Sequence, residues 1–424
     1  MQTHLAPEYA GTPEGEAAQA ILRKCVHCGF CTATCPTYQL LGDELDGPRG
    51  RIYLIKQVLE GAEPTRKTQQ HLDRCLTCRN CESTCPSGVQ YGQLVEIGRS
   101  VVDAKVERPA AERQVRWLLR EGMTSAAFGP ALKLGQLVRP LLPAALKNKV
   151  PPRPSVEQRA HALRWPTRSH PRRVLMLMGC VQPALAPNIN TATARVLDAC
   201  GIQTLVSDEA GCCGAIRAHL GDHDGAHADM RRNIDAWWPL IEGIGDNKPV
   251  EAIVFNASGC GVTVKEYGHA LRDDPAYADK AVRVSAVARD LSELLEDLLP
   301  TLKSQLGTRP PGTGPRARLA FHPPCTLQHG QQLRGGVEAA FTELGYEVQL
   351  ATVDPHLCCG SAGTYSVLQP DLAYQLRDRK VESLDARAPM AIISANVGCI
   401  QHLQTGTQTP VRHWVEVLDE ALAR

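Results

Sequence analysis

The chain has 424 residues, and its 46 basic and 45 acidic side chains nearly cancel. This balance provides no long-range attraction to nucleic acid or to an anionic membrane, and an aromatic content of only 4% argues against a base-stacking surface. The length is sufficient for two or three domains, each with a hydrophobic core.

No secretory or membrane-spanning segment is expected. The first twenty residues are polar and contain Pro7 and Pro13, and no run of eighteen apolar residues occurs. We therefore expect a cytoplasmic protein. Because disulfides are rare in that compartment, the 17 cysteines point to metal ligation.

Residues 1–100 contain two C-x2-C-x2-C-x3-C-P runs, which predict a helical domain of the two-cluster ferredoxin type. In this pattern three closely spaced cysteines bind one cluster, and the fourth binds the other cluster. The spacing therefore predicts two [4Fe–4S] clusters with crossed ligands. Cluster 1 is assigned to Cys25, Cys28, Cys31 and Cys85, and cluster 2 to Cys75, Cys78, Cys81 and Cys35.

Zinc is the alternative metal for these runs. Zinc sites use pairs of C-x2-C and need neither a third cysteine at the same spacing nor a proline after the fourth, so we favour clusters. His27 lies within the first run and is predicted to be a loop residue rather than a ligand. Nearby basic residues either raise the reduction potentials of the clusters or form a solvated face: Arg23, Lys24, Arg49, Arg51, Arg74 and Arg79.

Residues 101–171 are predicted to be a helical segment followed by a linker. WLLREGM and LKLGQLVRPLLPAAL have apolar residues at spacings of three and four, and residues 150–173 are rich in proline and basic residues. The apolar stretch from Ala126 to Val150 also contains Lys133, Arg139, Lys147 and Lys149. This pattern suits a helix on a membrane surface, and it equally suits packing against the ferredoxin-type segment or a partner protein.

Residues 172–306 and 317–424 form an internal repeat, with a second linker around residues 307–318 between them. Each half starts with an apolar run that ends in cysteine, RVLMLMGC or RLAFHPPC, and continues with alternating helix-like and strand-like stretches. This alternation predicts a parallel sheet covered by helices. The expected fold class is therefore multidomain α and α/β: a helical two-cluster ferredoxin domain followed by two repeated α/β cysteine-rich domains.

Each half contains four cysteines directly after predicted strands or in the loops there. They are Cys180, Cys212, Cys213 and Cys260, and then Cys325, Cys358, Cys359 and Cys399. Ligands of parallel sheets bind beyond the carboxyl ends of the strands, so each quartet is expected to converge. We favour a further metal or redox site in each half, one cluster per quartet, over buried structural thiols. The remaining Cys200 lies on an apolar helix face and is predicted to be core packing.

The repeated pattern of a cysteine, a Cys-Cys-Gly and a later cysteine resembles the cysteine-rich domain of heterodisulfide reductase and its relatives. With the ferredoxin-type segment in front, the chain is similar to two kinds of subunit, the iron–sulfur subunit of glycolate oxidase and the C subunit of anaerobic glycerol-3-phosphate dehydrogenase. The segments CVHCGFCTATCPTYQLLGDELDGPRG, RRNIDAWWPLIE, ASGCGVTVKEYG and HLCCGSAGTY resemble the glycolate oxidase family.

This resemblance implies an electron-transfer subunit. FAD-binding subunits would oxidise glycolate to glyoxylate, and this chain would pass the electrons toward a respiratory acceptor, with quinone expected. Peripheral contact with the cytoplasmic face of the inner membrane is part of the same expectation. The alternatives are a subunit of a related lactate or glycerol-3-phosphate dehydrogenase, a heterodisulfide-reductase-like enzyme, and a scaffold without a cofactor in the repeats.

Two features limit the chemistry of this chain. Relatives with five cysteines per repeat end in C-x2-C, whereas Ala257 and Asn396 stand at the first position of that pair here, which argues against disulfide cleavage. No G-x-G-x-x-G follows a predicted strand, so we expect no flavin on this chain. Hydride removal from a hydroxy acid needs a flavin or a nicotinamide, so we assign no catalytic residue here and expect the chain alone not to oxidise glycolate.

Overall fold

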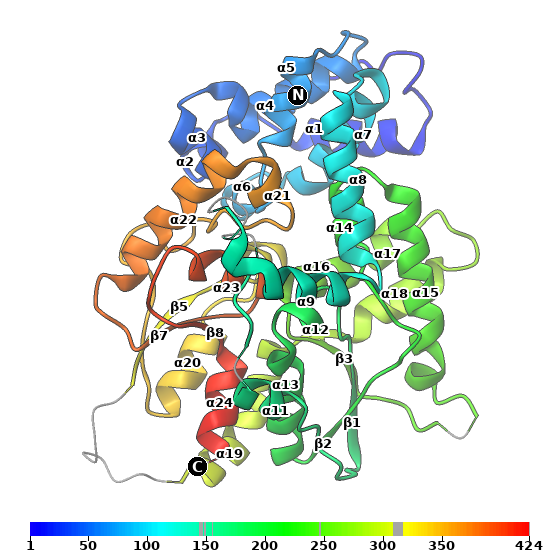
Figure 1. Cartoon of the computed structure of the whole chain (residues 1–424). Helices are drawn as coiled ribbons and strands as arrows, with labels where there is room; N and C mark the ends of the chain where they lie inside the picture. Colours follow the sequence, from blue (N-terminus) through cyan, green and yellow to red (C-terminus); the bar gives the residue numbers. More distant parts are fainter. Residues whose placement is uncertain (144–146, 148–149, 155, 246, 308–316, 424) are drawn as a thin grey trace.

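The computed structural model describes every residue except 144–146, 148–149, 155, 246, 308–316 and 424. The N-terminal helices lie at the top of the molecule in Figure 1, and two α/β units lie beneath them. Each unit is built on a four-stranded sheet in which all paired strands are parallel. The predicted fold class, a helical segment followed by two repeated parallel-sheet segments, is confirmed.

The first part of the chain consists of short helices joined by the two cysteine loops. Their core contains Leu22, Ile55 and Leu94, all essentially without solvent exposure. A Cβ atom on Gly98 would lie 2.5 Å from Ile55, so only glycine permits the close packing of the two helices that carry these residues. The elements are α1 Pro13–Lys24, α2 Phe30–Ala33, α3 Pro36–Leu41, η1 Glu44–Asp46, α4 Pro48–Leu59, α5 Arg66–Asp73, α6 Asn80–Thr84 and α7 Tyr91–Lys105.

Helices connect this part to the first sheet, and they lie within residues 101–171, where a helical segment followed by a linker is expected. They are α8 Ala110–Thr124, α9 Phe128–Val138 and η2 Arg139–Leu141. The predicted linker at residues 150–173 differs from expectation, because it contains the helix α11 Val156–Ala162. The prolines of this stretch lie before and after the helix rather than within it, and α11 packs against the next long helix of the chain.

The first α/β unit has the strand order β2-β1-β3-β4. The central strand β3 is buried along its whole length, as expected for a parallel strand covered on both faces. The strands are β1 Arg172–Met176, β2 Ile202–Leu205, β3 Ala252–Phe255 and β4 Ala288–Asp290. The helices are α12 Gln182–Leu185, α13 Pro187–Ala199, α14 Ala215–His219, α15 His223–Glu242, α16 Ser258–Lys265, α17 Tyr267–Ala270, α18 Ala278–Val287, η3 Leu291–Leu294 and α19 Leu295–Leu306.

The second unit repeats this arrangement with the order β6-β5-β7-β8. Its strands are β5 Arg318–His322, β6 Glu347–Gln349, β7 Ala391–Ser394 and β8 Val411–His413. Its helices are η4 Thr326–Gly330, which is a π-helical turn, and α20 Gly336–Glu343, α21 Tyr365–Leu368, α22 Pro370–Asp385, α23 Val397–Gln404 and α24 Trp414–Leu422. Most of the predicted second linker, residues 308–316, lies outside the described residues.

The fourth strand of each sheet, β4 and β8, is absent from the sequence-based expectation. Each has three residues and includes an arginine, Arg289 or Arg412, so neither forms the apolar run by which the other strands are recognised. Pairing with the fully buried strands β3 and β7 holds them in the sheets.

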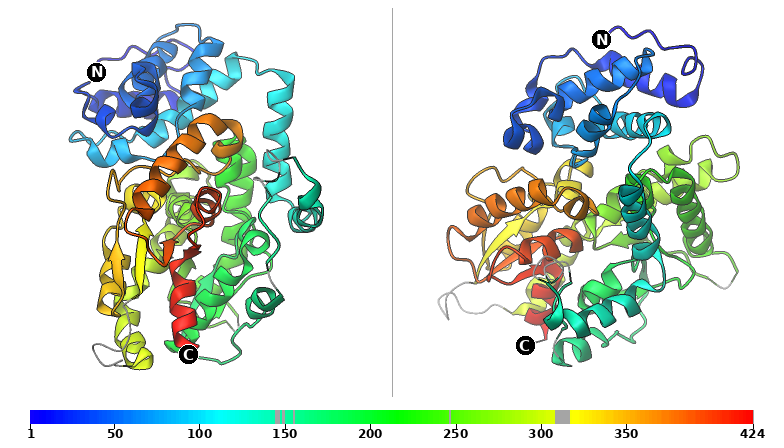
Figure 2. Two further views of the ribbon diagram at one scale, coloured as in Figure 1. Left: turned by 60° about the vertical axis from the view of Figure 1, so that its left-hand side comes forward. Right: turned by 45° about the horizontal axis from the view of Figure 1, so that its top comes forward.

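The two units share a hydrophobic core. Val174 of the first sheet and Ile392 of the second belong to one cluster of buried side chains, which also includes Trp414. Helix α13 packs against α24, and Arg195 on α13 forms an ion pair of 2.7 Å with Asp419 on α24. Figure 2 shows the N-terminal helices set across both units, with α22 of the second unit directly beneath them.

Candidate metal centres

The two N-terminal cysteine loops have the same backbone shape. In each run the residue before the second cysteine is left-handed, with φ of 59° at His27 and 51° at Thr77. The residue after it is also left-handed, with φ of 88° at Gly29 and 61° at Arg79. Non-glycine residues adopt this conformation at a cost of about 1–2 kcal/mol, so its repetition at matched positions marks a loop that must curl around something.

The eight cysteines of these runs line two adjoining cavities. Four of them, Cys25, Cys28, Cys31 and Cys85, line the first cavity. The second is lined by Cys35, Cys75, Cys78 and Cys81, and Cys81 also borders the first. The structure thus brings the fourth cysteine of each run to the three closely spaced cysteines of the other run. Cysteine thiolates are the ligands of iron–sulfur clusters, so both donor sets fit such a group, while ligation itself stays a prediction.

A buried cation lies beside the second cavity. Arg51 is 1% exposed, and it donates hydrogen bonds to the His71 carbonyl at 2.7 Å and to Thr37 Oγ1 at 3.1 Å. Its charge is paired with Asp46, which also accepts from Arg74 at 2.8 Å. Arg51 is therefore no part of a solvated basic face, whereas Arg23 and Lys24 are exposed.

The positive charge near the second cavity changes the acidity of its thiols. Burial alone would raise the pKa of Cys75, but Arg51 and Arg99 outweigh burial and lower it. Burial raises the pKa of Cys78 and of Cys81 well above the usual value. Without a metal ion, Cys78 and Cys81 are therefore protonated thiols. A bound metal ion would be needed to hold them as thiolates.

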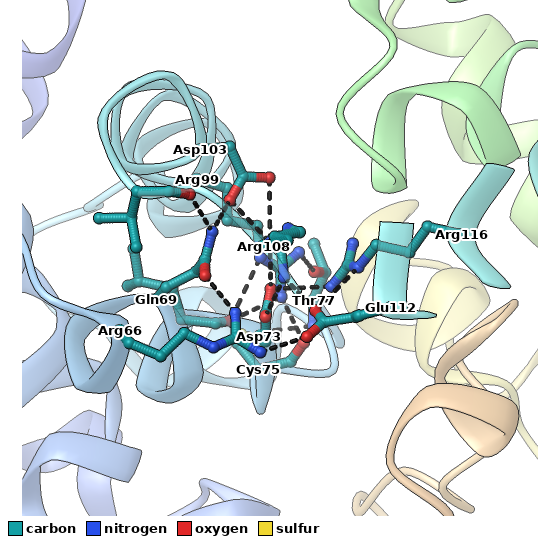
Figure 3. A network of polar contacts seen from close by, with 12 residues as sticks. Arg66, Gln69, Asp73, Cys75, Thr77, Arg99, Asp103, Arg108, Glu112 and Arg116 are labelled. Carbon is teal, nitrogen blue, oxygen red and sulfur yellow. Dashed lines mark hydrogen bonds and ion pairs between the residues drawn. The ribbon is translucent and has the colours of Figure 1, made fainter. Parts of the chain in front are cut away.

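A network of ion pairs fixes the start of the second loop (Figure 3). Arg99 on α7 donates to the carbonyl oxygens of Leu72 and Cys75 at 2.8 and 2.6 Å, and to Thr77 Oγ1 at 3.0 Å. Asp73, at the end of α5, pairs with Arg108 at 2.6 Å and with Arg116 at 3.0 Å. Helices α5, α7 and α8 are thereby tied together directly beside Cys75.

The first cavity opens toward solvent. Cys28 is exposed, and the neighbouring apolar side chains Val26 and Phe30 are 69% and 61% exposed. Arg49 lines this cavity and pairs with Glu44 at 2.6 Å. Burial raises the pKa of Cys31 to about 11. His27 is exposed on the same loop.

Each cysteine quartet of the repeats comes together at the carboxyl ends of its strands. In the first unit the Cys212 side chain lies beside those of Cys180 and Cys213, and Cys213 lies beside Cys260. In the second unit the Cys325 and Cys358 sulfur atoms lie 3.8 Å apart. The Cys359 side chain lies beside those of Cys358 and Cys399. Cys200 lies apart from both quartets, half-buried at the edge of the shared core.

Glycine is required in both Cys-Cys-Gly turns. Gly214 and Gly360 are left-handed, with φ of 93° and 88°, and the N–H of each donates to the first cysteine sulfur of its turn at 3.4 Å. A Cβ atom would lie 3.0 Å from the Ala226 carbonyl oxygen at Gly214 and 2.5 Å from the Ala373 carbonyl oxygen at Gly360. The first turn therefore packs closely against α15, and the second packs closely against α22.

Polar side chains hold the first of these turns from α15 and α17. Asn233 donates to the Cys212 carbonyl at 2.7 Å, and Tyr267 donates to the Cys213 carbonyl at 2.9 Å. Both side chains are fully buried. Near the second turn the buried Lys380 donates to the Asp354 carbonyl at 2.7 Å, and burial lowers the pKa of this lysine to about 8.

Helices begin at the two positions where a fifth cysteine is missing. Ala257 is the N-terminal cap of α16, and Asn396 caps α23 by accepting a hydrogen bond from the Gly398 N–H at 3.3 Å. Cys260 and Cys399 are consequently in the first turns of these helices. The Asn396 side chain acts on its own helix, which gives a local structural reason for its presence.

The second cavity lies next to the second quartet. Cys78 packs against a buried cluster that contains Cys325, Cys358 and Leu76. The Tyr365 hydroxyl donates to the Arg74 carbonyl at 3.0 Å, and Ser83 Oγ is hydrogen bonded to His329 Nδ1 at 3.0 Å. The sequence pattern did not indicate these contacts, which join residues more than 200 positions apart.

The predicted membrane-surface segment is largely exposed. Every residue of α8 and α9 is at least partly exposed, and Leu134, Leu137 and Leu141 are 63%, 60% and 87% exposed. Among the described residues of this segment, the main contacts of α9 are with α8, η2 and α12. Lys149 lies outside the described residues. Among the residues that are described, none of the helices is long and apolar enough to cross a membrane.

Comparison with known proteins places the same features in established families. Residues 21–89 match a family model described as a 4Fe-4S dicluster domain, and residues 174–265 and 319–404 both match a model described as a cysteine-rich domain. The chain is 53% identical over 430 residues to the glycolate oxidase iron-sulfur subunit of Escherichia coli, with the whole of both chains covered.

More distant relatives share the same description or only part of the chain. A probable glycolate oxidase iron-sulfur subunit of Bacillus subtilis is 30% identical over 417 residues, which is 91% of this chain and 89% of that protein. Lactate utilization protein A of Exiguobacterium is 27% identical over 258 residues, which is 59% of this chain and 98% of that protein. Iron–sulfur cluster binding by the ferredoxin-type and cysteine-rich parts follows from these matches.

Proposed function

The chain belongs to the family of glycolate oxidase iron–sulfur subunits, and on that premise we propose that it relays single electrons from a flavin-binding subunit that oxidises glycolate toward a respiratory acceptor. The observation that carries the proposal is the pair of adjoining cavities, which together are lined by all eight cysteines of the two runs. [4Fe–4S] clusters bound there would accept and release one electron at a time.

The residues around the two cavities differ in exposure, so the two proposed clusters have different surroundings. At the first cavity Cys28 and its apolar neighbours Val26 and Phe30 are exposed, which suits contact with a partner protein. At the second cavity Cys35, Cys75 and Cys81 are buried, and the partly buried Cys78 packs against the cluster that contains Cys325 and Cys358. We therefore place the flavin-binding subunit at the first cavity and the onward path through the second cysteine-rich repeat.

The proposed acceptor is the membrane quinone pool, reached by peripheral contact. Helix α9 supports this assignment, since Leu134, Leu137 and the nearby Leu141 expose most of their side chains and Lys133 lies among them. An amphipathic helix with exposed leucines and lysine buries its apolar face in the lipid headgroup region.

The experiment uses the assembled complex with two cysteine-to-serine variants. Cys78→Ser removes a proposed ligand between the two ends, and Cys200→Ser makes the same chemical change away from every cysteine group. We expect Cys78→Ser to abolish glycolate-dependent reduction of quinone while the flavin is still reduced by glycolate. Cys200→Ser should retain full activity. Quinone reduction at the wild-type rate in Cys78→Ser would overturn the relay.

A further inference from the structure

A buried histidine stands without a partner at the end of β5. His322 is 1% exposed, and among the described residues neither of its ring nitrogens has a hydrogen-bond partner. A neutral imidazole has one donor and one acceptor nitrogen, and burying both without partners costs free energy. Such a group is retained where something absent from the protein chain itself satisfies it.

The imidazole lies against two cysteines of the second quartet. One ring nitrogen of His322 and the sulfur atoms of Cys359 and Cys399 all lie within 4.8 Å of one another. All three side chains are buried, and they come from β5, the Cys-Cys-Gly turn and the first turn of α23. Donor atoms bound to one tetrahedral ion through bonds of about 2.0–2.3 Å lie somewhat closer together than 4.8 Å. A small movement of the three side chains toward one another would therefore bring them to ligand distance.

The first repeat lacks this nitrogen. His322 stands three residues before Cys325, and the residue three before Cys180 is Leu177. Leu177 is buried and belongs to the apolar core of the first unit. Asn396, at the position of a missing fifth thiolate, is occupied in capping α23. The two quartets are therefore chemically different, although their cysteines correspond one to one.

We propose that His322 is a ligand of the metal centre in the second cysteine-rich repeat, together with Cys359 and Cys399. The inference rests on the proposed function only in assuming that this repeat binds metal. The shared chemistry is a thiophilic first-row metal ion with mixed nitrogen and sulfur ligands, either iron of an iron–sulfur cluster or a single zinc ion. On iron, a neutral imidazole in place of an anionic thiolate gives a higher reduction potential than an all-cysteine centre has.

The test compares the full chain, prepared without oxygen, in four forms. They are the wild type, His322→Ala, His322→Cys and the matched control Leu177→Ala. The control also shortens a buried side chain to alanine, at the corresponding position of the first repeat. Metal content is measured by mass spectrometry. Pulsed electron paramagnetic resonance on protein labelled with ¹⁵N-histidine detects nitrogen bound to iron.

We expect a histidine nitrogen coupling in the wild type and in Leu177→Ala, and its loss in both His322 variants. His322→Ala should also lose metal, whereas His322→Cys should keep it, because the thiolate replaces the imidazole. Zinc that disappears in His322→Ala and returns in His322→Cys would also support the ligand and identify the ion as zinc.

Unchanged metal content and unchanged spectra in His322→Ala would overturn the proposal. Failure of the proposed function gives a different result. Signals from clusters in the two N-terminal cavities are expected in all four forms, so their absence from the wild type would contradict the relay rather than the histidine ligand. Circular dichroism of each variant shows whether it remains folded.

Discussion

Replacing Asp73 by asparagine tests whether the ion-pair network maintains the second cysteine loop. The Asp73 side chain is 8% exposed and so is that of Arg108, with which it pairs at 2.6 Å, and Arg116 lies 3.0 Å away. Asparagine keeps the shape of the Asp73 side chain and removes its negative charge. Arg108 and Arg116 then each lose one carboxylate partner. Because Arg108 keeps Asp103 and Glu112 as partners, we expect the free energy of unfolding to fall by about 1–3 kcal/mol.

The matched control lies in the same part of the chain. Glu107 pairs with Arg113, but their side chains are 81% and 52% exposed, so Glu107→Gln is expected to cost about 0–1 kcal/mol. Urea unfolding followed by circular dichroism gives both changes in the free energy of unfolding. Iron content is measured in parallel, and we expect Asp73→Asn to lose iron because the network holds Leu72, Cys75 and Thr77. Equal and small effects of the two substitutions would show that the ion-pair network does not maintain the second cysteine loop.

Two further substitutions test the cysteine turn and the membrane surface. Gly360→Ala puts alanine in a left-handed conformation, with its Cβ atom 2.5 Å from the Ala373 carbonyl oxygen, so we expect the free energy of unfolding to fall by more than about 2 kcal/mol. The control is Gly363→Ala, where φ is 62° and no atom lies within 4 Å of the added Cβ. We expect this substitution to cost only about 1 kcal/mol. Equal losses in thermal unfolding would contradict this account. Leu134→Glu should weaken sedimentation of the full chain with anionic lipid vesicles several-fold, because it puts a charge on the exposed apolar face of α9, and unchanged binding would exclude that face as the contact.

The local features of the fold and of the sites are predictable from the sequence. Cysteine spacing indicates which three neighbouring cysteines line each cavity, and the ferredoxin pattern adds the fourth cysteine from the other run. The buried strands β3 and β7 are continuous apolar runs, AIVF and AIIS, and are recognised as such. The glycines of the Cys-Cys-Gly turns likewise have a purely local reason.

Features that depend on distant contacts are not predictable in this way. Strands β4 and β8 are held by pairing with their neighbours rather than by their own composition. The hydrogen bond from Tyr365 to the Arg74 carbonyl joins residues 291 positions apart, and it places the second quartet beside the second cavity. His322 is one of 14 histidines, and nothing in the run RLAFHPPC shows that its ring nitrogens lack partners until the packing around it is seen.

Iron analysis combined with spectroscopy of single cysteine variants distinguishes crossed from uncrossed ligation of two clusters. We expect at least about eight iron ions per wild-type chain prepared without oxygen, four for each of two clusters in the N-terminal cavities. Crossed ligation further predicts that Cys85→Ser perturbs the same paramagnetic signal as Cys28→Ser and leaves the signal that depends on Cys78 intact. A Cys85→Ser variant that instead perturbs the Cys78-dependent signal would contradict the crossed arrangement of ligands.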